Sequence, residues 1–168
     1  MNSNKEKEFL GLISEHEGLI HKICHVYAVN ALAKQDLFQE IVIQLWKSFE
    51  NFRNESKIST WMYRVALNTA LSEKRRSKTK VSFGFLDSLK DDMAQNALDA
   101  DQENINMLYS AISKLTEVEK AIVMLYLDDK SYGEMEDVLG INQGALRVKM
   151  NRIKEKLRQI TKTSQYGT

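Results

Sequence analysis

Residues that interrupt helices or build tight turns are scarce in this sequence. It contains no proline and only 7 glycines among 168 residues, which leaves strand-rich folds poorly supported and favours long helices. The single cysteine excludes an internal disulfide. No apolar run approaches the roughly 20 residues needed to span a bilayer, and the charged start MNSNKEKEF lacks the apolar core of a signal peptide. We therefore expect an all-α, cytoplasmic protein without membrane insertion.

Charge is segregated along the chain, although the net charge is only +1. Residues 73–80 carry a net charge of +4, residues 87–103 carry -5 and residues 142–158 carry +5. This distribution excludes a polycationic coat for nucleic acid and indicates local basic surfaces instead. We predict two small helical domains, residues 1–80 and 104–162, joined by a flexible acidic linker at residues 81–103.

Residues 131–157 have the pattern of a helix-turn-helix, two helices around a tight turn. Ser131 can cap the first helix together with Glu134, and Gly140 suits the left-handed conformation that ends it. Asn142 can cap the second helix. Apolar residues recur in the second helix at intervals of four and three, which predicts one buried face: Leu146, Met150, Ile153, Leu157 and Ile160.

The opposite face of that second helix is basic, with six cations against Glu155 between residues 142 and 158. A helix with one buried face and one cationic face can lie in the DNA major groove and reach phosphates and base edges. The alternative is a solvated basic helix in a bundle, because charged helix faces are common. The turn chemistry in front of the helix favours DNA binding.

Three helices are predicted in the N-terminal half, over residues 5–29, 36–49 and 61–78. Gly18 is a weak point in the first of them, and Ser59 or Thr60 can cap the third. After the linker, Thr116 and Glu119 have the capping-box spacing ahead of another helix.

The second predicted helix begins with acidic residues. Asp36 and Glu40 suit the positive end of the helix dipole, which is a purely structural interpretation. The alternative is a docking surface for a basic partner.

Residues 50–60 form a polar segment between two predicted helices, bracketed by Phe52 and Trp61. Aromatic rings can stack on exposed bases while cations follow the backbone, so the segment is suited to hold single-stranded DNA. Its polar candidates are Arg53, Asn54 and Lys57. The alternative is that both rings are core residues, and for Trp61 we favour it.

Four potential metal ligands lie in the first predicted helix: His16, His21, Cys24 and His25. His21 and His25 share a face, a spacing that metals can use. No second cluster follows, so packing and surface roles are favoured, and we expect no metal and no cofactor. The sequence also shows no carboxylate cluster and no nucleophile with a positioned base, so we expect neither enzymatic activity nor a small-molecule substrate.

Two parts of the sequence resemble one family, the bacterial RNA polymerase sigma factors. The second conserved region of that family is similar to DLFQEIVIQLWKSFENFR followed by STWMYRVALNTALSEKRR. The fourth is similar to LTEVEKAIVMLYLDDKSYGEMEDVLGINQGALRVKMNRIKEKL. Their order and spacing resemble the short extracytoplasmic-function (ECF) group of the sigma-70 family, and the resemblance covers nearly the whole chain.

The resemblance implies an initiation factor that binds core RNA polymerase and promoter DNA. Core polymerase would contact Asp36, Gln39 and Glu40. The melted non-template strand of the -10 element would contact Phe52, Arg53, Asn54, Lys57, Asn68, Arg75 and Arg76. The -35 duplex would contact Gln143, Arg147, Val148, Lys149, Asn151 and Arg152. An anti-sigma factor is a common further partner in this family.

The chain departs from the family pattern in the second helix of the helix-turn-helix, where Ala145, Leu146 and Val148 replace frequent threonine, valine and serine residues. Val148 offers a methyl contact in place of a hydroxyl, so the -35 sequence cannot be carried over from relatives. Val42 and Thr116 likewise replace a common phenylalanine and a frequent proline. The alternative function is an autonomous helix-turn-helix repressor or activator, which would bind duplex DNA tightly without polymerase.

Overall fold

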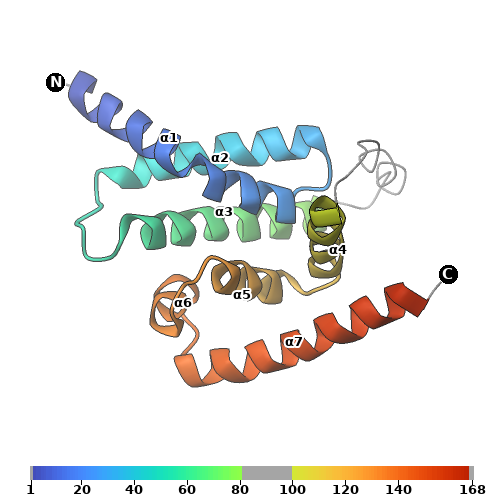
Figure 1. The fold of residues 1–168 in the computed structure, drawn as a ribbon. Coiled ribbons are helices and arrows are strands. Elements are labelled where there is room, and N and C mark those ends of the chain that lie inside the picture. Colours follow the sequence, from blue (N-terminus) through green and yellow to red (C-terminus); the bar gives the residue numbers. More distant parts are fainter. Residues whose placement is uncertain (1, 81–99, 167–168) are drawn as a thin grey trace. The chain divides into compact units, whose positions relative to one another are not determined.

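The computed structural model describes residues 2–80 and 100–166, and every regular element in these two ranges is a helix (Figure 1). The all-α prediction is therefore confirmed. The chain forms two compact units, residues 1–93 and 94–168. Most of the predicted acidic linker, residues 81–99, lies outside the described residues, and residues 100–103 belong to a helix. Within the described ranges, none of the helices has an apolar stretch that would let it cross a membrane.

The first unit is built from α1 (Asn2–Tyr27), α2 (Ala31–Phe49) and α3 (Ile58–Lys80). Each helix packs against the other two, and Figure 1 shows α2 and α3 side by side with α1 crossing them. The predicted weak point at Gly18 does not interrupt α1. The apolar faces meet in a core that includes Phe9, Ile20, Ile23, Ile41, Leu45, Met62, Tyr63 and Leu67.

Two helix starts in this unit differ from the prediction. Asn30 caps α2, because its side chain accepts a hydrogen bond from the backbone N–H three residues on at 2.8 Å. Asp36 is consequently the sixth residue of α2 and lies beyond the first turn, so the prediction that it begins the helix and suits the dipole is wrong. The third helix begins at Ile58, which places Ser59 and Thr60 inside it rather than at its cap.

The second unit contains α4 (Ala100–Ser113), α5 (Glu117–Leu127), α6 (Tyr132–Leu139) and α7 (Gln143–Tyr166). The long α7 packs against each of the other three helices. Its predicted apolar stripe is buried at Leu146, Met150 and Ile153 and half-buried at Leu157 and Ile160. Facing side chains complete the core: Ile112, Ile122, Leu125, Met135 and Val138.

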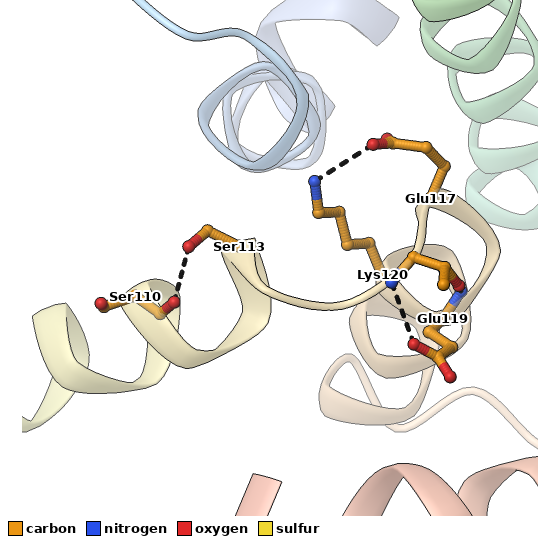
Figure 2. A network of polar contacts seen from close by, with 6 residues as sticks. Ser110, Ser113, Glu117, Glu119 and Lys120 are labelled. Carbon is orange, nitrogen blue, oxygen red and sulfur yellow. Dashed lines mark hydrogen bonds and ion pairs between the residues drawn. The ribbon is translucent and has the colours of Figure 1, made fainter. Parts of the chain in front are cut away.

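Local hydrogen bonds define the start of α5 as the sequence predicts. The Thr116 hydroxyl accepts from the Glu119 N–H at 3.3 Å, and the Glu119 carboxylate accepts from the Thr116 N–H at 2.9 Å. Figure 2 shows this turn, in which Lys120 also pairs with Glu117 at 3.3 Å. The capping box therefore fixes where α5 begins.

The helix-turn-helix geometry is also confirmed residue by residue. Ser131 and Glu134 form a second capping box at the start of α6. Gly140 ends α6 in the left-handed region with φ 68°. The Asn142 side chain accepts from the Ala145 N–H at 2.8 Å and so caps α7. Together these contacts fix the turn that presents α7.

Gly140→Ala is expected to destabilise the protein by about 1–2 kcal/mol, because an alanine in the left-handed region brings its Cβ too close to the backbone. Beyond this local backbone, no atom lies within 4 Å of a Cβ built at Gly140, so the cost comes from the backbone conformation and not from a clash with a neighbouring element. Thermal unfolding measures it. The control is Gly144→Ala inside α7, which is expected to be neutral or stabilising, and equal losses for the two variants would contradict the explanation.

Candidate nucleic-acid interface

The exposed face of α7 carries all six residues predicted to contact the -35 duplex. Burial of Leu146, Met150 and Ile153 turns the opposite side of the helix outward. The first three turns present polar and cationic side chains to solvent, with one apolar residue among them: Gln143, Arg147, Val148, Lys149, Asn151 and Arg152. Within the described residues, no carboxylate forms an ion pair with any of these cations. The structure therefore brings the predicted set together on one exposed surface.

The three later cations of the 142–158 segment interact within the second unit. Lys154 Nζ lies 4.6 Å from the centroid of the Tyr126 ring. Lys156 Nζ pairs with the Glu119 carboxylate at 2.8 Å, and Arg158 pairs with Glu155 at 3.2 Å. The C-terminal half of the cationic segment is thus engaged by α5 and by α7 itself.

Glu119 links the cap of α5 to α7, and its titration gives a stability prediction. Burial opposes its ionisation, but the Lys156 ammonium and the Thr116 N–H outweigh burial and hold the pKa of this carboxyl below its ordinary value of 4.5. The stabilisation is therefore complete above pH 4.5 and is lost as the pH falls through the lowered pKa.

Glu119→Gln is expected to destabilise the protein by roughly 0.2–1 kcal/mol at neutral pH, since glutamine keeps the capping hydrogen bond but loses the ion pair. Denaturant unfolding across the acid range measures the difference between variant and parent. It should shrink towards zero as the pH falls through the lowered pKa of the parent carboxyl. A difference that stays constant with pH would contradict the ion-pair explanation.

Among the described side chains of α7, Val148 is the one exposed large apolar residue, and half of its surface is accessible (50%). A valine side chain exposed to water makes no apolar contact, whereas a thymine methyl group in the major groove offers it one. The flanking cations and amides can reach phosphates and other base edges.

Of the two aromatic residues beside the polar loop (residues 50–57), one lies in the core and the other is half-buried. Trp61 is buried, with 8% of its surface exposed, so its predicted core role is confirmed. The half-buried Phe52 packs against it with the rings tilted and their centroids 4.8 Å apart, and the Phe49 ring of α2 lies 6.3 Å from the Trp61 ring, centroid to centroid. The core rings therefore hold Phe52 in place at the base of the loop.

The polar residues of the loop lie at the surface. Arg53, Asn54 and Lys57 are exposed, and Asn54 has a φ of 58°, a left-handed conformation that asparagine tolerates. Asn54 and Phe52 line a pocket whose other wall is the N-terminal half of α1. This wall is acidic, so the pocket suits an uncharged base better than a phosphate.

Asn68 lies in a different recess, a groove between α2 and α3. It stands ten residues after the start of α3, about 15 Å along the helix, and none of the loop residues lines its groove. No described residue hydrogen-bonds to its exposed amide. Arg76 lines the same groove and pairs with Glu73 at 3.4 Å, while Arg75 is exposed nearby in sequence. The predicted -10 residues thus follow the length of α3 instead of forming one pocket.

The three predicted polymerase contacts lie on α2. Asp36 and Gln39 are exposed, and Glu40 is half-buried beside Asn68 in the groove, where its carboxylate accepts a hydrogen bond from Gln44 at 2.8 Å. The structure separates Glu40 from the other two, because it faces α3 while they face solvent.

Exposed apolar side chains extend the face of Asp36 and Gln39, and the sequence prediction omitted them. Leu32 and Ile43 are 68% and 45% exposed. The signal is present in the sequence, because positions 32, 36, 39 and 43 are spaced four, three and four apart and form a second stripe. Trp46 continues this stripe at 40% exposure. An exposed apolar stripe with an aromatic ring and polar residues beside it is typical of a protein interface.

Two of the four potential metal ligands of α1, Cys24 and His21, take part in packing. Burial raises the pKa of the Cys24 thiol to about 11, so the thiolate form that binds metals is disfavoured. The His21 ring stacks on Phe38 at 4.7 Å between centroids. Burial, with Lys34 nearby, lowers the pKa of His25. Within the described residues, no group of three potential ligands could hold a metal ion.

The two helical units correspond to two known families. Residues 12–80 match Sigma-70 region 2, and residues 105–157 match Sigma-70, region 4. The ECF RNA polymerase sigma factor SigW of Bacillus subtilis is 25% identical over 166 residues, covering 90% of this chain and 87% of SigW. The ECF RNA polymerase sigma-E factor of Haemophilus influenzae is 26% identical over 162 residues, covering 89% of this chain and 85% of that protein.

Solved structures share the fold. The sigma factor RpoE from Bartonella quintana, in complex with the anti-sigma factor NepR, is similar with a TM-score of 0.73 at 16% identity, over 93% of this chain and 98% of RpoE. CnrH in complex with the cytosolic domain of CnrY gives a TM-score of 0.68, also at 16% identity, over 94% of this chain and 90% of CnrH. Since both sigma-70 regions are present in order, the chain belongs to the sigma-70 family of RNA polymerase sigma factors, in its ECF group, and directs promoter-specific transcription.

Proposed function

We propose that this sigma factor reads the -35 duplex with the first three turns of α7 and captures the melted -10 strand along α3 and the loop before it. The region 2-like domain would span residues 1–80, the linker 81–103 and the region 4-like domain 104–162. The observation that carries the -35 assignment is the division of the α7 cations. Arg147, Lys149 and Arg152 have no acidic partner among the described residues, while Lys154 and Lys156 interact within the unit.

Opening of the -10 element would proceed without catalysis. A base that unstacks from the duplex costs a few kcal/mol, and a pocket that receives it recovers this cost and traps the open state. Phe52 offers a ring fixed by Trp61, and the amides of Asn54 and Asn68 can bond to base edges. The protein needs no cofactor and no small-molecule substrate for this role.

Core polymerase would dock on the exposed stripe of α2. Asp36 and Gln39 supply the polar contacts, and Leu32, Ile43 and Trp46 supply apolar area. Glu40 contributes at the edge of this surface, next to the groove. We place the protein in the cytoplasm, where polymerase and promoter DNA are found.

An anti-sigma factor is proposed as the regulator of this chain. RpoE was captured with the anti-sigma factor NepR, and CnrH with the cytosolic domain of CnrY. Both complexes share the fold seen here, which supports a partner of the same class.

Transcription by purified core polymerase on a genomic promoter library, with and without this protein, tests the proposal. New 5' ends that share spaced -35 and -10 sequences are expected, and they would supply the promoter specificity. Absence of new starts, together with tight polymerase-independent binding to duplex DNA, would instead support an autonomous helix-turn-helix regulator.

A further inference from the structure

Among the cations in the first three turns of α7, Arg147 is the one with an aromatic partner in the described residues. Its guanidinium carbon lies 5.0 Å from the centroid of the Tyr132 ring. Tyr132 is the first residue of α6, whereas Arg147 is in the second turn of α7. The two residues are 15 positions apart in sequence, and the helix-turn-helix fold brings them together.

The first turn of α6 is held in place by local bonds. Ser131 N donates to the Glu134 carboxylate at 2.8 Å, and Glu134 N donates to the Ser131 hydroxyl at 3.1 Å. This reciprocal pair fixes the backbone on both sides of Tyr132. A second side chain of α7 passes over the same turn, since Gln143 Nε2 lies 3.7 Å from a Cβ built at Gly133. The start of α6 therefore forms a fixed support beneath the first turns of α7.

A ring and a carboxylate hold a guanidinium in different ways. A carboxylate takes the N–H edge, the same edge that forms a bidentate pair with guanine. An aromatic ring takes the flat face and leaves the donors available. Among the described residues, no carboxylate forms an ion pair with Arg147. Tyr132 can thus restrict the arginine without competing with DNA for its donors.

We propose that Tyr132 is a positioning residue for -35 recognition, which holds the Arg147 guanidinium in the orientation that reads a guanine. This inference rests on the proposed function, because it assumes that Arg147 contacts a base. A free arginine must give up rotamer freedom when it binds, and a pre-oriented one gives up less.

The test measures the preference of the polymerase holoenzyme for each base at every -35 position, using a promoter library randomised there. Tyr132→Leu, which removes the ring but keeps an apolar side chain, is expected to lower the preference at the Arg147-dependent base pair about three- to tenfold. Tyr132→Phe should retain the parental preference, because the ring face supplies the contact. In the double variant with Arg147→Ala, the Tyr132→Leu effect should vanish. Thermal unfolding checks that each variant is folded.

Several results would overturn the inference. Uniform weakening at all promoters by Tyr132→Leu would indicate a structural role, and an equal loss in Tyr132→Phe would indicate a hydroxyl contact with DNA. Additive losses in the double variant would show that Tyr132 acts independently of Arg147. Failure of the proposed function looks different: Arg147→Ala would then leave every base preference unchanged, and the positioning role would fall with it.

Discussion

Replacement of Arg147 by alanine is expected to cost about 1–3 kcal/mol of discrimination at one base pair of the -35 element, about 5- to 150-fold. The guanidinium is exposed, is unpaired with any described carboxylate and lies over the Tyr132 ring, so its N–H donors are available for a bidentate contact with guanine. Run-off transcription on promoters substituted at each -35 position measures the effect. The loss should be confined to one position.

Two matched variants distinguish recognition of a base from electrostatic attraction to the DNA backbone. Lys149→Ala should weaken all promoters about equally and reduce the salt dependence of binding by about one phosphate contact, because a lysine on a phosphate carries no sequence information. Arg158→Ala should change little, because this arginine is already paired with Glu155 on a later turn of the same helix. An unchanged promoter preference in Arg147→Ala would reject the base-reading role.

The turn chemistry of the second unit could be predicted because it is local. Ser131 and Glu134, and likewise Thr116 and Glu119, are three positions apart, and the bonds they form depend only on the helix start between them. Gly140 marks the end of α6 because few other residues adopt its backbone conformation. Asn30 lacks such a paired signal, since alanine stands three positions after it, and the sequence pattern therefore predicts a start of α2 that is too late in the chain.

The division of the α7 cations could not be predicted, because it depends on tertiary contacts. Lys156 is 37 positions from Glu119 in the chain, and Lys154 meets a tyrosine on α5. A helical pattern places these cations on the polar side of α7 but does not reveal which neighbouring helix supplies their partners. The separation of Asn68 from the polar loop has the same origin, since it follows from the packing of α2 against α3.

Asn68→Ala is expected to lower the population of open promoter complex about 5- to 150-fold while polymerase affinity stays within about twofold. The amide is exposed in the groove and has no described hydrogen-bond partner, so it is available to the edge of an unstacked base. Its loss leaves that polar edge unsatisfied, which costs about 1–3 kcal/mol. Permanganate reactivity of unpaired thymines measures opening, and fluorescence titration with core polymerase measures binding.

Ser72 and Asp36 supply the controls that make this prediction specific. Ser72 lines the same groove one turn further along α3, so Ser72→Ala should leave opening nearly unchanged if the Asn68 amide itself bonds to the base. Asp36 lies on the exposed stripe of α2, so Asp36→Ala should weaken polymerase binding but not the opening of complexes already bound. Equal losses of binding and opening in Asn68→Ala would remove the base-capture assignment. They would make the groove part of the polymerase-docking surface instead, a role for which Glu40 on its opposite wall already provides a carboxylate.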